Sequence, residues 1–245
     1  MTARTLHTLP ATGPPPGAVP VLLPDGRVVS LRPLRPGERD PLLAVFDGMS
    51  FASRARRYLT GMVRLPAPAL EALTAVDGHR HVAWLASDHG RPVGIARLVR
   101  DADGVADVAV EVVDDHHGRG IGSALVDAVT TVAAARGVRR VRASLTPDNE
   151  PSRRLVTRIG VRLQVAGDLL EGEGGLRLLH PPRIDRQAAL LLAGRAAEER
   201  PEAPGALHLH RTSTTSQRPR PRLEHVTYRR EEPPCRPPRS ITPRP

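Results

Sequence analysis

The apolar positions in the central part of the chain form short runs separated by turn residues, a pattern typical of β-strands. Two such runs within residues 19–33 predict a β-hairpin around Asp25-Gly26, a dipeptide that favours a type I′ turn. In the run from residue 105 to residue 113, only Asp107 and Glu111 interrupt the apolar sequence. Beyond the hairpin, strands are predicted at residues 81–87, 92–100, 105–113, 138–145, 161–166 and 176–179.

Helical periodicity and capping residues predict helices between these strands. Ser50 and Asn149 belong to the residue types that cap a helix, Pro41 fits a first turn, and Gly160 fits a helix end. The predicted helices cover residues 40–47, 50–58, 68–73, 121–135 and 151–159. This mixture of strands and helices predicts a sheet domain of the α/β or α+β class over residues 19–182.

Both ends of the chain differ in composition from this domain. Residues 1–18 are rich in proline, glycine, threonine and alanine, and they are predicted to be disordered. Residues 183–200 favour a further helix. Residues 201–245 hold ten prolines with scattered arginines and no periodicity, which predicts a disordered tail. We expect a solvated tail rather than a nucleic-acid partner, since no aromatic residues are interleaved to stack on bases.

Charge and composition restrict the class of protein. The net charge is +10, and all 36 basic residues are arginine. The single cysteine, Cys235, excludes an intramolecular disulfide framework. No apolar run approaches the roughly 20 residues of a membrane span, and prolines interrupt any signal peptide near the start. These features predict a cytoplasmic protein that does not associate with membranes.

The segment after residue 113 carries the most specific chemistry. A strand leads into a turn with Gly118, Gly120 and Gly122, and a helix follows, so successive amides at the helix start form a site for phosphate. The P-loop is excluded because the chain contains no lysine. The dinucleotide fingerprint is excluded because Ser123 stands where a third glycine is required. A connection with only a packing role remains the alternative.

Two carboxylates precede this turn on one strand. Side chains alternate between the faces of a strand, so Asp107, Ala109 and Glu111 share a face. A partly desolvated carboxylate can accept a proton, which makes Asp107 and Glu111 candidate general bases. The alternative is that each is a solvated charge. No metal site is expected, because the neighbouring histidines lack a cysteine or carboxylate at ligand spacing. These histidines are His79, His81, His89, His116 and His117.

The glycine turn resembles the coenzyme A pyrophosphate loop of the GNAT superfamily of N-acyltransferases. Gly120 and Gly122 match that loop, and His117 stands where glutamine or arginine is usual. The resemblance implies a mixed, mostly antiparallel sheet flanked by helices, with acetyl-CoA as co-substrate. Further similarity to the protein-lysine acetyltransferase branch lies in residues 26–38, 53–58, 76–81 and 106–112. In that branch a glutamate at the position of Asp107 is the general base.

The resemblance also implies a set of cofactor contacts. Backbone amides of Val112 and Val113 are expected to hold the thioester and the pantetheine arm. Asn149 and Ser152 are expected to flank the arm and the adenine, although their alternative role is helix capping. Val156 occupies the position of a tyrosine that protonates the leaving thiolate in many relatives. Arg119 is a candidate to add positive charge to the loop. The loop residues expected to contact the pyrophosphate are His117, Gly118, Arg119, Gly120, Ile121, Gly122 and Ser123.

Together these features predict an N-acetyltransferase that moves an acetyl group from acetyl-CoA to a primary amine. The acceptor is a small molecule or a protein, with a protein lysine as one candidate. A competing hypothesis is a non-catalytic acyl-CoA-binding or interaction module with a basic tail. The sequence leaves the acceptor, the acyl-chain preference and the oligomeric state open.

Overall fold

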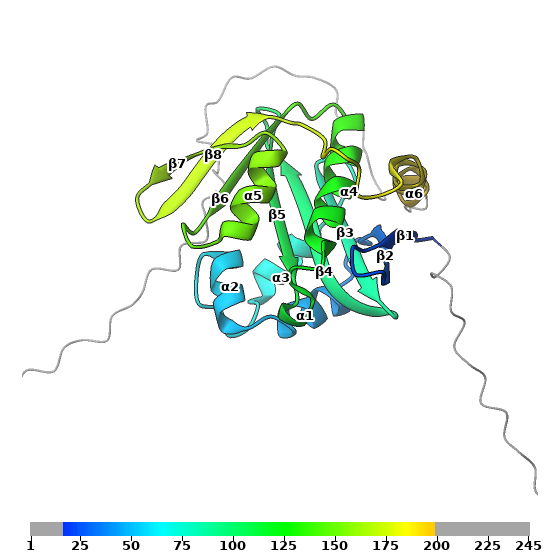
Figure 1. Cartoon of the computed structure of the whole chain (residues 1–245), viewed down its shortest axis with the longest axis horizontal. Helices are drawn as coiled ribbons and strands as arrows, with labels where there is room; N and C mark the ends of the chain where they lie inside the picture. Colours follow the sequence, from blue (N-terminus) through cyan, green and yellow to red (C-terminus); the bar gives the residue numbers. More distant parts are fainter. Residues whose placement is uncertain (1–16, 199–245) are drawn as a thin grey trace, which may run out of the picture. The chain divides into compact units, whose positions relative to one another are not determined.

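The computed structural model describes residues 17–198, which fold around one eight-stranded sheet (Figure 1). The strands are β1 (Val19–Leu22), β2 (Val28–Pro33), β3 (His81–Asp88), β4 (Arg91–Arg100), β5 (Val105–Val112), β6 (Arg140–Leu145), β7 (Arg162–Ala166) and β8 (Leu169–Gly175). The helices are α1 (Asp40–Asp47), α2 (Phe51–Tyr58), α3 (Ala67–Thr74), α4 (Ile121–Ala135), α5 (Glu150–Arg158) and α6 (Arg186–Glu198), with a short 3-10 helix η1 (Asp114–His116).

The sheet has the strand order β1-β2-β3-β4-β5-β6-β8-β7, and only β5 and β6 are parallel. Their pairing is short: it runs from Val105 to Asp107 on β5, opposite Arg140 to Arg142 on β6. Beyond Asp107, β5 remains paired with β4 up to Val112 but has separated from β6. The mixed, mostly antiparallel sheet predicted from the sequence is therefore confirmed, and it contains an opening between its two central strands.

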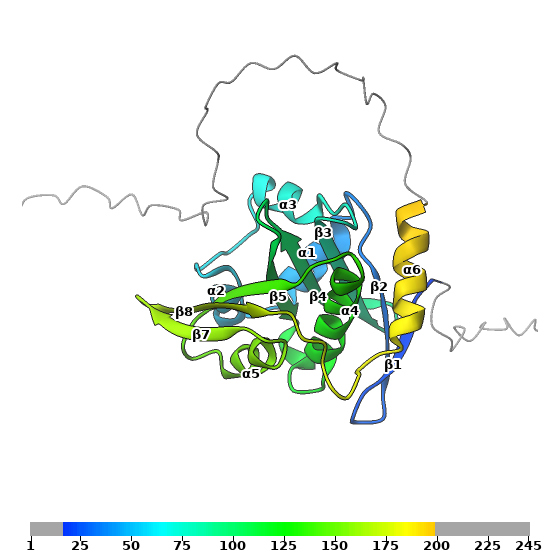
Figure 2. The same ribbon diagram turned by 90° about the horizontal axis from the view of Figure 1, so that it is seen from above.

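Helices cover both faces of the sheet. In Figure 2, α1 and α3 lie on one side, and α4 and α5 lie on the other. Helix α4 packs against β3, β4 and β5, and it also contacts α6. This sandwich excludes water from large side chains of both layers, which supplies the main stabilising free energy. The core includes Leu31, Phe46, Trp84, Ile95 and Leu125.

Two local predictions are wrong. The hairpin forms, but residues 23–27 make a longer connection in which Gly26 has φ +80° and Asp25 does not have a positive φ, so the turn is not type I′. The last strand is β8, not residues 176–179, because a turn at Gly167 (φ +60°) brings β8 back along β7 and β6. The glycines of β8 allow its backbone to approach the neighbouring part of the chain closely, and this strand forms in place of the one that the apolar residues 176–179 predicted.

Helix α6, predicted within residues 183–200, packs against α4 and β2. Asp127 of α4 is fully buried and accepts hydrogen bonds from Arg186 Nε and Nη2 at 3.0 and 2.6 Å, and from the amide of Arg183 at 2.6 Å. This buried carboxylate fastens the segment that starts α6 to the body of the domain. The predicted disorder of residues 1–18 and 201–245 lies outside the described residues, apart from Gly17 and Ala18. No helix between residues 17 and 198 has the length and apolar character required to cross a membrane.

Candidate active site

The glycine loop presents a row of backbone amides at the start of α4. Gly118 and Gly120 have φ +73° and +94°, and Gly120 caps the helix without a side-chain hydrogen bond. Within residues 17–198, the amides of residues 118–123 donate no hydrogen bond, whereas the amide of Ala124 already bonds Gly120. Unsatisfied amides at a helix N-terminus favour an anionic ligand. The loop therefore fits a pyrophosphate group.

Gly120 and Gly122 differ in what they require, and this difference is testable. An L-residue with positive φ at position 120 costs about 1–2 kcal/mol, and its Cβ would lie 3.2 Å from Pro24 Cδ. A Cβ at Gly122 would meet nothing nearer than 3.8 Å. We expect Gly120→Ala to lower the unfolding free energy and weaken coenzyme A binding. Gly122→Ala should retain stability in urea denaturation, and equal losses in both variants would contradict this assignment.

The strand before the loop has one unpaired edge. The amide of Val113 donates a hydrogen bond to Val93 O of β4 at 2.9 Å. Successive residues of a strand direct their backbone N–H and C=O groups to opposite sides, so those of Val112 and Val110 point away from β4. On that side β6 has separated, which leaves this edge open to a ligand. Val112 O accepts a hydrogen bond from His117 Nε2 at 2.8 Å. The predicted role of Val113 is therefore corrected: its amide is already used within the sheet.

A cavity of about 580 Å³ lies between this edge, the loop and helices α2 and α5. Most of the predicted cofactor residues line it: Val112, His117, Gly118, Gly120, Ile121, Gly122, Ser123, Asn149 and Ser152. Arg119 does not line it, because its side chain pairs with Asp25 on the opposite side of the loop. The structure thus brings these residues together around one cavity and leaves Val113 and Arg119 outside its wall.

Helix α5 forms the wall opposite the loop. Asn149 Oδ1 accepts a hydrogen bond from the amide of Ser152 at 3.2 Å, so the capping role proposed for these residues is present. Both residues also line the cavity, and capping therefore does not exclude a role in binding. Val156 is buried in the core and does not line the cavity.

Glu111 lies in the cavity wall within a buried cluster of charges. Its carboxylate is 3.0 Å from Arg97 Nη2, 2.7 Å from Arg57 Nε and 3.2 Å from Tyr58 Oη, and the residue is only 4% exposed. Burial raises the pKa of Glu111, but the charges of Arg57 and Arg97 and the hydrogen bonds from Arg97 and Tyr58 outweigh burial and lower it. Burial, followed by the charge of Glu111, raises the pKa of Tyr58. Glu111 is thus a fixed anion that Tyr58 stabilises as a hydrogen-bond donor.

Asp107 has a different environment. It lies at the last paired position of β5 and β6, does not line the cavity, and has a side chain that is 54% exposed. Arg142 of β6 holds both of its oxygens, with Nε and Nη2 at 2.8 and 2.7 Å. The structure therefore brings Glu111 into the cavity and places Asp107 at the apex of the opening between the strands.

Several residues of the site were not predicted from the sequence. Arg97 and Tyr58 were not recognised as partners of Glu111, although an arginine within an apolar strand was a signal for a buried charge pair. Arg57 of α2 lies in the cavity wall beside Glu111, a long-range contact that no local pattern indicated. Its neighbour Arg56 pairs with Asp148 at 2.8 Å, and both line the cavity.

No metal-binding group of three or more His, Cys, Asp or Glu side chains is present between residues 17 and 198. Histidines beside the glycine loop instead contact carboxylates and the backbone. His116 Nε2 lies 3.2 Å from Asp88 Oδ2, and His117 bonds Val112 O.

The sheet opens between its two parallel strands and presents unpaired amides at the adjacent helix start, an arrangement that fits the predicted likeness to the GNAT acyltransferases. The sequence model of the protein family described as "Acetyltransferase (GNAT) family" matches residues 52–161. Acetyltransferase PA5475 of Pseudomonas aeruginosa is 31% identical over 144 residues, which cover 56% of this chain and 77% of that protein. The chain therefore belongs to the GNAT acetyltransferase family and is an acyltransferase.

Similarity to one branch of the family is visible in two further relatives. Acetyltransferase Pat of Mycolicibacterium smegmatis is 35% identical over 147 residues, covering 58% of this chain and 44% of that protein. The chain thus spans less than half the length of this relative. The crystal structure of the GNAT domain of S. lividans PAT has a TM-score of 0.60 at 27% identity, covering 67% of this chain and 99% of that one. This supports the predicted likeness to the Pat branch.

Proposed function

We propose that this protein transfers an acetyl group from acetyl-CoA to a primary amine, with a protein lysine as one candidate acceptor. The proposal is carried by the continuous path from the unpaired amides of residues 118–123 to the unpaired edge of β5. A pyrophosphate bound at the start of α4 would direct the pantetheine arm along Val112 and Val110. The thioester would then lie toward the apex where β5 and β6 separate.

The acceptor amine must lose its proton, because an ammonium group has no lone pair with which to attack the thioester. We assign this step to Asp107, acting through water. Asp107 is three residues from Val110, about 10 Å along the strand, and its exposed carboxylate keeps lone pairs for water beside the bonds from Arg142. The amine then forms the C–N bond, and the C–S bond breaks to release the thiolate.

Glu111 is assigned a positioning role instead. Its lowered pKa and its three hydrogen-bonding or ion-pair partners make it a poor proton acceptor near neutral pH. As a permanent anion it holds Arg57 in the cavity wall. The apolar Val156 provides no proton for the leaving group, and a thiol pKa of about 8.5 allows the thiolate to leave unprotonated.

The proposal is tested by incubating the protein with acetyl-CoA and a panel of small amines and lysine-containing proteins. Thiol release and acetylated product should appear together for at least one acceptor, and both should fall in Asp107→Asn. Tight coenzyme A binding with no product for any acceptor would identify a non-catalytic acyl-CoA-binding module instead. Absence of coenzyme A binding would contradict both functions.

A further inference from the structure

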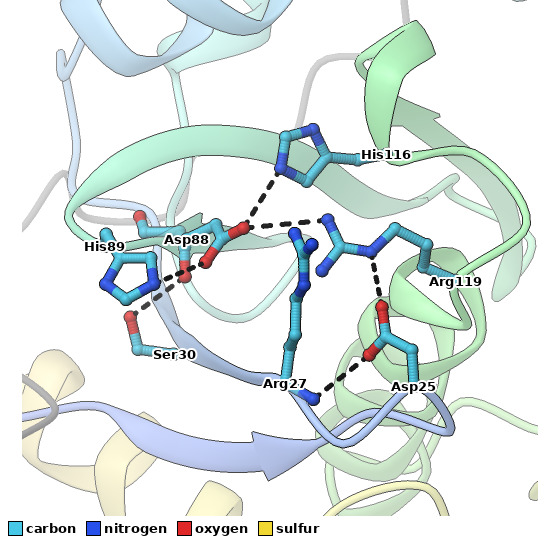
Figure 3. Close-up of polar contacts among 8 residues, drawn as sticks. Asp25, Arg27, Ser30, Asp88, His89, His116 and Arg119 are labelled. Carbon is cyan, nitrogen blue, oxygen red and sulfur yellow. Dashed lines mark hydrogen bonds and ion pairs between the residues drawn. The ribbon is translucent and has the colours of Figure 1, made fainter.

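We infer that Arg119 is a positioning residue that holds the pyrophosphate loop from the side opposite the cavity. This inference rests on the proposed binding of coenzyme A. Arg119 is a loop cation next to the amides that would bind phosphate, yet its guanidinium group faces other protein groups. Figure 3 shows it between Asp25 and Asp88. Its side chain is only 15% exposed.

The first anchor is Asp25, in the connection between β1 and β2. Asp25 Oδ2 accepts a hydrogen bond from Arg119 Nε at 2.9 Å, across 94 residues of sequence. Its other oxygen accepts the amide of Arg27 at 3.1 Å, which fixes the carboxylate relative to its own turn. The hydrogen bond from the Arg27 amide, followed by that from Arg119, lowers the pKa of Asp25, so the anchor remains charged.

The second anchor is Asp88, at the end of β3. Its Oδ2 lies 3.6 Å from Arg119 Nη1 and 3.2 Å from His116 Nε2, and its side chain is 11% exposed. Two loop residues therefore meet one carboxylate at the end of β3 (Figure 3). The loop is held at both ends of the short segment from His116 to Arg119.

Packing supports the same arrangement independently of charge. A Cβ on Gly120 would lie 3.2 Å from Pro24 Cδ, so the β1–β2 connection directly contacts the loop at the helix cap. This contact and the Asp25–Arg119 pair join the same two segments. The N-terminal hairpin thus reduces the conformational freedom of a glycine-rich loop before the ligand binds, and preorganisation of this kind increases affinity.

The sign of a charge effect distinguishes this role from direct phosphate binding. If Asp25 merely neutralised a phosphate-binding arginine, its replacement by asparagine would remove a negative charge near the ligand and tighten binding of the anionic coenzyme A. If Asp25 anchors the loop through Arg119, the same substitution loosens the amides and weakens binding. Local electrostatics and loop positioning therefore predict opposite results.

The test measures calorimetric affinities of the full-length protein for coenzyme A and for pantetheine, which lacks the pyrophosphate. We expect Asp25→Asn to weaken coenzyme A binding by about tenfold. This is the entropic cost of ordering about one backbone residue of the loop when the ligand binds. Arg119→Gln should do the same, and the double variant should be no weaker than either single variant. Pantetheine affinity and the thermal unfolding midpoint should remain close to wild type.

Asp115→Asn is the matched control, because Asp115 is an exposed carboxylate of the same loop with no ion pair or side-chain hydrogen bond within the described part of the chain. Its affinity for coenzyme A should remain within about twofold of wild type. The positioning role would be overturned if Asp25→Asn bound coenzyme A as tightly as Asp115→Asn does. It would also be overturned if Asp25→Asn lost as much affinity for pantetheine as for coenzyme A. A wild-type protein that binds no coenzyme A would instead overturn the proposed function.

Discussion

Replacing Asp107 with asparagine is expected to lower the rate of acetyl transfer by about a hundredfold to a thousandfold, the usual contribution of a general base. Coenzyme A affinity should remain unchanged, because Asp107 lies outside the cavity wall. Steady-state kinetics with a saturating acceptor measure the first effect, and calorimetry measures the second. The Asp107→Glu variant, which introduces the residue of the related branch, should retain most of the activity.

Loss of the Arg142 ion pair is the competing explanation for a slow Asp107→Asn variant. Asp101 also pairs with Arg142, with its Oδ2 at 3.3 Å from Nη2, so Asp101→Asn removes a carboxylate charge from the same arginine. This control should keep near wild-type turnover. Unchanged turnover in Asp107→Asn, or an equal loss in Asp101→Asn, would exclude Asp107 as the base.

Replacing Glu111 with glutamine should produce the largest loss of stability, about 3–5 kcal/mol in the free energy of unfolding. The substitution leaves Arg57 and Arg97 as adjacent buried cations without their shared anion. Urea denaturation at neutral pH measures the loss. As a control, Glu150→Gln removes ion pairs with Arg153 and Arg154 on the surface of α5, and its effect on stability should be much smaller than that of Glu111→Gln.

The Glu111 effect should also depend on pH with a defined sign. The pKa of Glu111 is lowered in the folded state from its ordinary value of 4.5, so its contribution to stability is present above that value. It is lost as the pH falls below 4.5 toward the folded-state pKa. The stability difference between wild type and Glu111→Gln should therefore shrink in acid, and a difference that stays constant down to pH 3 would contradict the assigned ion cluster.

Local sequence signals predicted much of the fold. The helix at residues 121–135 was predicted with the bounds that the structure gives to α4, and the caps at Ser50 and Asn149 are present. Apolar periodicity, glycine and capping residues act within a few positions of the chain, so a sequence pattern can report them. The glycine loop belongs to the same class of local signal.

Long-range partners could not be predicted in this way. The Arg97–Glu111 pair depends on the register between β4 and β5, and the Asp25–Arg119 pair joins segments 94 residues apart. Charge type alone does not indicate which carboxylate meets which arginine. For the same reason, the alternation of residues in β5 placed Asp107 and Glu111 on one face but did not reveal that one is buried and the other exposed.

The most direct test of the account is a crystal structure of the protein bound to coenzyme A. We predict a pyrophosphate hydrogen-bonded to the amides of residues 118–123, and a pantetheine arm along the β5 edge at Val112 and Val110. The sulfur should face the apex of the opening, with a water molecule on Asp107 placed to accept the proton of an incoming amine. A pyrophosphate held by the Arg119 side chain, or a sulfur directed away from the opening between β5 and β6, would contradict the account.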